Sequence, residues 1–256
     1  MQFTSFYTYT IIYIGDNMID ELQKMINDSN NIVFFGGAGV STESGIPDFR
    51  SKDGLYNIKY KYNPEEILSP HFFLNNTNEF YEFYKDKMNC LDKEPSTCHK
   101  FLKKLEDSGK LKAIVTQNID GLHTKANSTH VYELHGSIHR NYCMKCGKFY
   151  SGKIVFDSKN IPTCECGGII KPDVVLYEEA LDNYTVENSI KAISNADMLI
   201  IGGTSLTVYP ASGLINYFHG KYLVIINKQT TPYDNMANLV INDSLKNVFS
   251  KIKVQD

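Results

Sequence analysis

The sequence predicts an α/β protein, in which a Rossmann-like parallel sheet forms the large domain and carries a smaller inserted module. Three observations support this class. Short apolar segments alternate with amphipathic helical ones, polar and glycine-rich stretches follow the apolar segments, and four cysteines are concentrated between positions 143 and 166. Strands separated by helices pair in parallel, and the carboxyl ends of such strands form the usual ligand site of an open α/β sheet.

The first expected element is a helix over residues 18–29, where Ile19, Leu22 and Ile26 form one apolar stripe. The expected strands are short, apolar and rich in β-branched residues, as is typical of strands buried on both faces. They cover residues 32–35, 111–116, 129–134, 171–177, 197–201, 222–226 and 239–241. Further helices are expected over residues 78–88, 95–109 and 185–194.

Two segments differ from this alternation. Residues 1–17 show no helical period, no basic start and no signal-peptide cleavage site. We therefore expect Met18 to be the natural start and residues 1–17 to be a leader that is not native or is disordered. Residues 51–90 are crowded with aromatic side chains and interrupted by Pro64 and Pro70. They are expected to form a helical lid over the ligand site or, equally, a rigid aromatic cluster.

The composition is that of an ordinary soluble globular protein. The 256 residues are 42% hydrophobic and 21% charged, which is enough to bury a real core. A net charge of −3 and a pI near 6.2 argue against nucleic acid as a partner. No apolar run approaches the ~20 residues of a membrane span, so no membrane contact is expected. The clustered cysteines suit a metal site in a reducing compartment, which predicts a cytoplasmic protein.

The most distinctive segment is residues 31–50, in which an apolar strand runs into a glycine loop that contains Gly37 and Gly39. Glycines at this place let phosphates approach backbone N–H groups and a helix N-terminus. The dinucleotide fingerprint is imperfect, because Thr42 stands where a third glycine is expected. Asn227, at the end of a later strand, is the better candidate for the adenosine ribose. A plain glycine turn is the alternative for this segment.

The cysteine pattern is Cys143-x-x-Cys146 followed by Cys164-x-Cys166. Four thiolates in two close pairs suit tetrahedral Zn²⁺, with free thiols or an iron–sulfur centre as alternatives. Four cysteines complete the coordination sphere. The zinc, one ion per chain, is therefore expected to be structural and not catalytic.

Polar residues at the other strand ends are ambiguous on their own. A lone His135 is more often a structural histidine, and Asn118 and Asp120 can be turn residues that follow a strand. Because all three lie at the carboxyl ends of expected strands, contact with a ligand is the other interpretation.

Taken together, these segments resemble the sirtuin family, the NAD-dependent protein lysine deacylases, in its bacterial type. The resemblance extends over nearly all of the chain from Met18 to Asp243. The parts that carry it are residues 37–50, 116–123, 135–136 and 203–206, the four cysteines and Asn227. The first two segments are long and specific.

The resemblance implies a Rossmann-like NAD-binding domain with a smaller module, and NAD lying between them. The large domain would comprise residues 18–50, 91–136 and 171–256. The small module would comprise a helical, lid-like part at residues 51–90 and a zinc-binding part at residues 137–170.

The resemblance also implies which residues bind NAD as a co-substrate. Those near the ADP-ribose portion are Ala38, Thr42, Thr204, Ser205, Asn227 and Asp243, and Gly39 and Gly203 belong to the same set. Those near the nicotinamide, its ribose and the phosphates are Phe49, Arg50, Gln117, Ile119 and Asp120. Asp120 would engage the carboxamide of nicotinamide.

By the same resemblance, His135 is the catalytic histidine, and Asn118 lies near the nicotinamide ribose and an ordered water. The acetyl oxygen of the substrate attacks the ribose carbon as nicotinamide leaves, and His135 then takes a proton from the ribose hydroxyls. The products would be free lysine, nicotinamide and O-acetyl-ADP-ribose. An imidazole that titrates near neutrality suits this general-base role.

Residues 171–179 resemble the strand against which sirtuins bind an acetylated protein or peptide as an added strand. The carbonyl of Val175 would accept the N–H of acetyl-lysine. Glu178 stands where the family commonly has glycine, and this departure favours basic residues beside the acyl-lysine. The only arginines are Arg50, already assigned to the phosphates, and Arg140, beside the zinc module. Because a charged acyl group needs an arginine partner, we expect an acetyl or other uncharged acyl group.

Two other functions remain open. An enzyme of the same fold that transfers ADP-ribose to protein would use the same NAD residues, and His135 does not exclude it. A non-catalytic zinc ribbon could instead hold protein or nucleic acid through residues 137–170. The second alternative leaves residues 117–120 and His135 without a role.

Overall fold

The computed structural model describes residues 17–48, 54 and 60–254. Residues 17–28 form the first helix, close to the expected bounds. The expected leader lies outside the described residues except for its last position, as do Phe49 and Arg50 of the glycine loop. Within the described ranges, no helix is both long and apolar enough to cross a membrane.

Six parallel strands form the large sheet, in the order β3-β2-β1-β7-β8-β9. They are β1 (Ile32–Gly36), β2 (Leu111–Thr116), β3 (Val131–Glu133), β7 (Met198–Gly202), β8 (Tyr222–Ile226) and β9 (Leu239–Ile241). The chain builds outward from β1 on one side and from β7 on the other, so the strand order reverses between these two neighbours. Ligands bind beyond the carboxyl ends of the strands at such a reversal.

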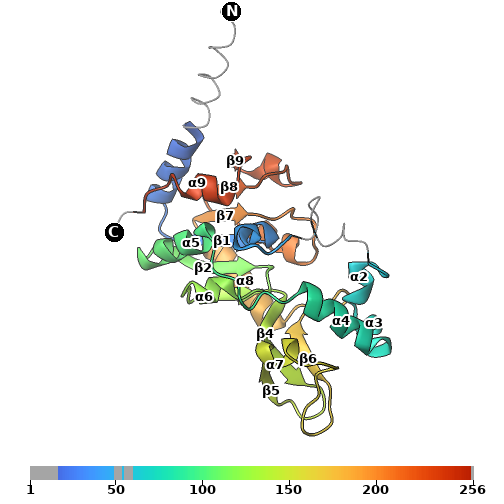
Figure 1. The fold of residues 1–256 in the computed structure, drawn as a ribbon. Coiled ribbons are helices and arrows are strands. Elements are labelled where there is room, and N and C mark those ends of the chain that lie inside the picture. Colours follow the sequence, from blue (N-terminus) through green and yellow to red (C-terminus); the bar gives the residue numbers. More distant parts are fainter. Residues whose placement is uncertain (1–16, 49–53, 55–59, 255–256) are drawn as a thin grey trace, which may run out of the picture.

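Helices cover both faces of the large sheet, which is why β1 is buried at every position (Figure 1). Phe34 packs into a cluster with the first helix and with α5 (Thr97–Asp107) and α9 (Leu245–Phe249). Its neighbour Phe35 points to the other face, where α8 (Asn183–Asn195) and the 3-10 helix η4 (Ala211–Tyr217) pack. This alternation along one strand places a hydrophobic core on each side.

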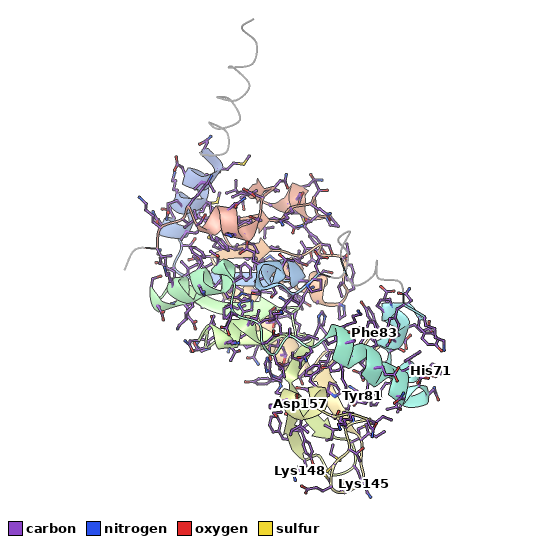
Figure 2. All side chains as sticks on the ribbon, in the orientation of Figure 1. His71, Tyr81, Phe83, Lys145, Lys148 and Asp157 are labelled. Atoms are coloured by element: carbon purple, nitrogen blue, oxygen red, sulfur yellow. The ribbon has the colours of Figure 1, made fainter. Side chains whose placement is uncertain are left out.

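A smaller antiparallel sheet has the order β5-β4-β6. Its strands are β4 (Gly136–Cys143), β5 (Phe149–Ser151) and β6 (Ile170–Val174), with helix α7 (Gly152–Phe156) after β5. Helices α2 (Pro64–Ile67), α3 (Pro70–Asn75) and α4 (Thr77–Lys87) lie beside this sheet (Figure 1). One hydrophobic cluster joins these helices to the small sheet, with Tyr81 of α4 lying toward it (Figure 2). The Tyr81 hydroxyl donates to the Ile170 carbonyl at 2.5 Å.

The remaining short elements lie in the loops. They are the 3-10 helices η1 (Ala38–Val40), η2 (Thr42–Ser44) and η5 (Asp234–Met236) and the helix α6 (Leu122–Lys125). Both η1 and η2 follow β1, so the glycine loop continues as two 3-10 turns and does not enter a standard helix.

Most expected elements are confirmed within a few residues, and three boundaries were wrong. The strand expected over residues 171–177 ends at Val174, after which the Val175 N–H donates to the His135 carbonyl outside the β4–β6 pairing. The helix expected from Pro95 begins at Thr97, because Ser96 and His99 form a capping box there. The strand expected over residues 129–134 pairs only at Val131–Glu133.

Candidate functional site

The loops after β1 and β7 touch at the carboxyl edge of the large sheet. The Gly39 N–H donates to the Gly203 carbonyl at 2.8 Å. A Cβ atom on Gly39 would lie 2.7 Å from the Gly203 Cα, so these backbones approach as closely as they do only because Gly39 has no side chain. Gly203 itself adopts φ +61°. Both predicted cofactor glycines are therefore brought together here.

Gln117 lies beside these glycines, at the end of β2. Its side-chain oxygen accepts a hydrogen bond from the Thr204 hydroxyl at 2.9 Å, and a Cβ on Gly37 would come within 3.0 Å of that oxygen. The amide nitrogen of Gln117 is buried and has no hydrogen-bond partner among the described residues. A buried donor without a partner is costly, so a polar ligand at this edge of the sheet would satisfy it. This supports the fit of a nucleotide to the loop.

Asp120, Ser41 and Asn118 form a buried hydrogen-bonded group. The Ser41 hydroxyl donates to the Asp120 carboxylate at 2.6 Å and accepts from the Asn118 amide at 3.0 Å. The Leu122 N–H donates to the other carboxylate oxygen at 2.9 Å. Burial raises the pKa of Asp120, and these hydrogen bonds oppose the rise. The carboxylate is therefore fixed in position as an acceptor.

His135 is fixed through one ring nitrogen. Its Nδ1 lies 2.8 Å from the Gln117 carbonyl. Since a carbonyl only accepts, Nδ1 carries the proton and Nε2 is left with a lone pair. Burial lowers the pKa of His135 below 6.5, although the hydrogen bond to Gln117 opposes this shift. The neutral imidazole that results can accept a proton at Nε2.

The other predicted contacts lie around the same edge. Asn227 follows β8, and its amide nitrogen donates to the Gln229 carbonyl at 2.9 Å. The Asp243 carboxylate accepts from the Ser244 N–H at 2.6 Å and from the Asn247 amide at 2.9 Å. It is therefore already hydrogen-bonded to residues at the start of α9. The remaining predicted residues that are described, each half-buried, are Ala38, Thr42, Ile119 and Ser205.

Ser41 and His139 are site residues that the sequence did not single out. Ser41 lies inside segment 37–50, and a polar side chain in that glycine loop could have been predicted as a site residue from the sequence. His139 lies near the Asp120 backbone, with its Nε2 at 2.9 Å from the Asp120 carbonyl. Nothing in the sequence places a residue of β4 against that loop.

The four predicted zinc ligands converge. Their sulfur atoms all lie within 4.8 Å of one another, with 3.4 Å between Cys143 and Cys166 and 3.6 Å between Cys146 and Cys164. Tetrahedral Zn²⁺ with Zn–S bonds of 2.3 Å separates its sulfurs by about 3.8 Å. The cluster thus fits one structural zinc ion. Among the described residues it is the one group of ligand side chains close enough to bind a metal.

Val175 follows β6, which is an edge strand of the small sheet. Its N–H donates to the His135 carbonyl at 3.0 Å, so the two predicted site residues are linked through the backbone. Glu178 adopts φ +74°, the left-handed conformation that glycine favours. Glu178 therefore keeps the left-handed backbone conformation that a glycine would adopt at this position.

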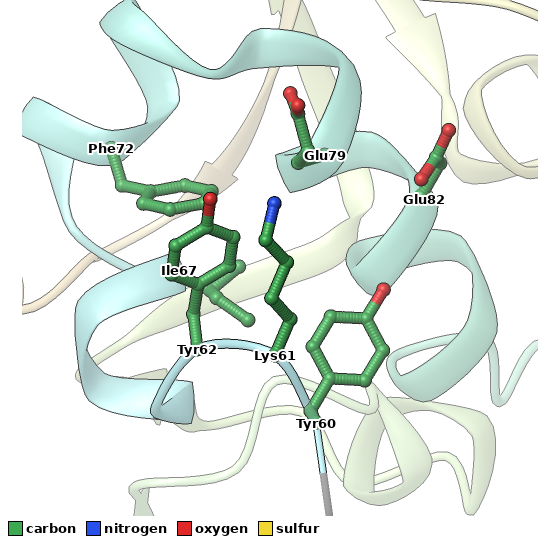
Figure 3. Close-up of a pocket in the computed structure, with 7 residues that line it drawn as sticks. All are labelled: Tyr60, Lys61, Tyr62, Ile67, Phe72, Glu79 and Glu82. Carbon is green, nitrogen blue, oxygen red and sulfur yellow. The ribbon is translucent and has the colours of Figure 1, made fainter.

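Of two hollows lined by described residues, only the first includes a predicted site residue. The first, of about 260 Å³, lies beside Val175 and Gly136. The other, of about 430 Å³, is formed by α2, α3, α4 and residues 60–62 (Figure 3). Lys61 points into it toward Glu79 and lies 4.8 Å from the Tyr62 ring centre.

The sequence has close relatives. The Sir2 family model matches residues 37–210. A Clostridium acetobutylicum protein named NAD-dependent protein deacetylase is 60% identical over 238 residues, which cover 91% of this chain and 97% of that protein. A Clostridium perfringens protein of the same name is 58% identical over 241 residues, which cover 93% of this chain and 99% of that protein.

Solved structures agree with the sequence comparison. A Sir2 structure with a deacetylated p53 peptide and 3'-O-acetyl-ADP-ribose has a TM-score of 0.84 at 36% identity, covering 91% of this chain and 96% of that chain. A Sir2 structure with a p53 peptide and NAD⁺ has a TM-score of 0.81 at 36% identity and the same coverage. The family model spans the glycine loop and the cysteine module, and the chain belongs to the Sir2 family, the sirtuins.

Proposed function

We propose that the protein is an NAD-dependent protein deacetylase that removes the acetyl group from acetyl-lysine. The observation that carries this proposal is the geometry at the strand reversal. There, His135 follows β3 and is held by the Gln117 carbonyl, and its Nε2 has no hydrogen-bond partner among the described residues. Gln117 directly precedes Asn118 of the buried group formed by Asp120, Ser41 and Asn118. The Clostridium relatives named NAD-dependent protein deacetylase support the same function.

The chain offers a suitable set of groups for NAD. Bound NAD supplies nicotinamide as a leaving group and ADP-ribose as the acceptor of the acetyl group. The glycine loops admit a phosphate backbone closely, and the unpartnered Gln117 amide offers a hydrogen bond to a polar ligand. The residues that would hold NAD are Ala38, Gly39, Thr42, Gln117, Ile119, Asp120, Gly203, Thr204, Ser205 and Asn227. Phe49, Arg50 and Asp243 complete the set that the family resemblance implies.

His135 acts as the general base in this proposal. Its Nε2 accepts a proton while Nδ1 keeps its hydrogen bond to the Gln117 carbonyl, which stabilises the imidazolium that forms. Asn118 is the second proposed catalytic residue. Its amide is held by Ser41, so it is fixed to orient a water or a hydroxyl. Asp120 would accept from the nicotinamide amide.

The acetylated peptide would bind as a strand beside Val175, whose carbonyl accepts the acetyl-lysine N–H. Arg140 is engaged by Glu133 and Asp173, so it is not available to pair with an acyl carboxylate. We therefore expect an uncharged acyl group. An acetyl-lysine peptide should turn over faster than its succinyl counterpart, and faster turnover of the succinyl peptide would contradict this assignment.

We also infer a division of the chain in which residues 137–170 bind one structural zinc ion and residues 51–90 form the helical part of the small module. Residues 18–50, 91–136 and 171–256 make the NAD-binding domain. The hydrophobic cluster that joins α2, α3 and α4 to the small sheet supports this division. None of the six cysteines, all of which lie in the described part of the chain, forms a disulfide, and this suits a reducing, cytoplasmic location.

The deciding experiment incubates the protein with NAD and an acetyl-lysine peptide and measures nicotinamide release. Release that depends on the acetyl group is expected, and the variant His135→Ala should lose it while keeping its circular dichroism spectrum. Release without acetyl-lysine, together with transfer of labelled ADP-ribose to protein, would instead identify an ADP-ribosyltransferase. Absence of release in both assays would overturn the enzymatic function.

A further inference from the structure

The pairing between β4 and β6 is interrupted next to the site. Ser137 is paired with Asp173, and the next pair joins Asn141 to Pro172. Residues 138–140 of β4 therefore have no partner on β6. Proline has no N–H, so β6 cannot donate a backbone hydrogen bond there. Over this stretch no backbone pairing connects the two strands.

The Arg140 side chain supplies a connection there. Its Nε donates to the Asp173 carboxylate at 2.7 Å, and its Nη1 donates to the Glu133 carboxylate at 2.6 Å. Asp173 stands two residues before Val175, and Glu133 stands two residues before His135. One guanidinium thus connects the last residue of β3, in the large sheet, to β6, in the small sheet.

The other two residues of the bulge contact the loop that follows β2. The Ile138 N–H donates to the Ile119 carbonyl at 3.0 Å. The His139 Nε2 lies 2.9 Å from the Asp120 carbonyl and donates to it, since a carbonyl only accepts. The bulge at residues 138–140 is therefore hydrogen-bonded to three segments that carry proposed site residues: the loop after β2, the end of β3 and β6.

We propose that Arg140 is a positioning residue, which holds His135 and the Val175 strand in their relative geometry through its ion pairs with Glu133 and Asp173. This inference rests on the proposed function of His135 and Val175. Neither the sequence motifs nor the position beside the zinc module assigns a role of this kind to Arg140. A lysine would keep the charge but could not reach both carboxylates with a rigid planar fork.

A purely structural role must be separated from a positioning role. The Glu133 side chain is only 12% exposed, so loss of Arg140 leaves a nearly buried carboxylate without its partner. That alone lowers stability. The double variant Glu133→Gln/Arg140→Met removes the uncompensated charge and should recover the thermal midpoint. If Arg140 positions the site, kcat stays low in this double variant, because the connection between the strands is still missing.

The test compares wild type with Arg140→Met, Arg140→Lys and the double variant, using an acetyl-lysine peptide and NAD. Small displacements of reacting groups cost up to about 100-fold in rate, and we expect kcat of Arg140→Met to fall ~10- to 100-fold. Arg140→Lys should recover part of this loss. The KM for NAD should change much less than kcat. Lys153→Met is the matched control, because it removes an exposed ion pair with Asp157 in the same module.

A second measurement needs no ligand. The Val175 N–H and the Ile138 N–H should exchange with solvent faster in the double variant than in wild type, and Lys153→Met should leave both rates unchanged. The inference is overturned if kcat of Arg140→Met stays within about twofold of wild type. It is also overturned if the double variant recovers both its kcat and its thermal midpoint. If wild type releases no nicotinamide, the proposed function fails. The exchange rates then decide the positioning role, and unchanged rates overturn it.

Discussion

Among the described residues, the His135 ring is oriented by its hydrogen bond to the Gln117 carbonyl, and burial determines the direction of its pKa shift. Burial lowers the pKa of the free imidazole below 6.5, so the neutral form predominates at pH 7. We expect kcat/KM to remain level from pH 8 to about 7 and to decline on the acid side with a midpoint below the ordinary histidine value of about 6.5. The measurement is kcat/KM against pH with an acetyl-lysine peptide. A midpoint at or above the ordinary value would contradict the assignment of His135 as the base.

Ser41 carries a second prediction at the scale of one residue. Its hydroxyl is shared between the Asp120 carboxylate and the Asn118 amide, and both partners are buried. Hydrogen bonds to charged groups contribute about 2 kcal/mol, so Ser41→Ala should lower kcat/KM by ~30-fold.

Ser44 provides the control for this variant. It lies in the same loop, and its buried hydroxyl has no hydrogen-bond partner among the described residues. Ser44→Ala should therefore leave kcat/KM close to that of wild type. Equal losses of kcat/KM in the two variants would show that any substitution in this loop lowers activity. They would contradict the specific role proposed for the Ser41 hydroxyl.

At the scale of elements, the small sheet depends on its metal. β4 ends at Cys143, and the other three cysteines of the metal group lie in or directly before turns, with Gly147 at φ +71° and Gly167 at φ +79°. Cys143 and Cys164 also belong to the hydrophobic cluster that includes α4. Zinc binding energy is therefore part of the folding energy of the sheet and of the packing of the helices against it.

Removal of one ligand tests this dependence. Cys143→Ser should lower the zinc content below one ion per chain and cause the small sheet to lose its hydrogen-exchange protection, since three ligands leave the coordination sphere open. Cys90→Ser is the control, because Cys90 is a buried thiol outside the metal group. It should keep one zinc per chain, as measured by elemental analysis. Full zinc content and protection in Cys143→Ser would contradict the structural role.

The elements also show what a sequence can predict. Strand positions were predictable because apolar β-branched runs are local signals, and the cysteine spacing named the metal ligands. Contacts between distant segments were not. Ser41 meets Asp120 across 79 positions, and Arg140 meets Asp173 across 33. No local pattern specifies such a pair. The start of α5 was misplaced because His99, and not glutamate, completes its capping box.

At the scale of the whole molecule, two buried histidines lie between helices α5 and α6, and Ser96 links one of them to the glycine loop. His99 on α5 and His123 on α6 have ring centres 4.5 Å apart, and their exposed fractions are 0% and 2%. The Ser96 hydroxyl lies 2.8 Å from His99 Nδ1 and donates to the Val40 carbonyl at 3.0 Å. Protonation of this pair would place charge between α5 and α6, against the loop proposed to hold NAD.

Burial lowers the pKa of His99 to about 4 and that of His123 well below 6.5. Well above pH 6.5 both rings are neutral whether the chain is folded or unfolded, so they do not contribute to the pH dependence of stability there. Between pH 6.5 and about 4 the unfolded chain binds protons that the folded chain does not. The free energy of unfolding must therefore fall as the pH falls, by ~3 kcal/mol from His99 alone at the lower end.

Urea unfolding from pH 8 to pH 5 measures this slope. His99→Gln should unfold with a flatter dependence on pH than wild type, whatever its stability at pH 8, because one of the two buried titrating rings is gone. His71→Gln changes an exposed histidine on α3 and should keep the wild-type slope. Carboxylates that titrate in the same range contribute equally to all three proteins. Parallel curves for wild type and His99→Gln would therefore show that the buried ring is not the source of the acid sensitivity.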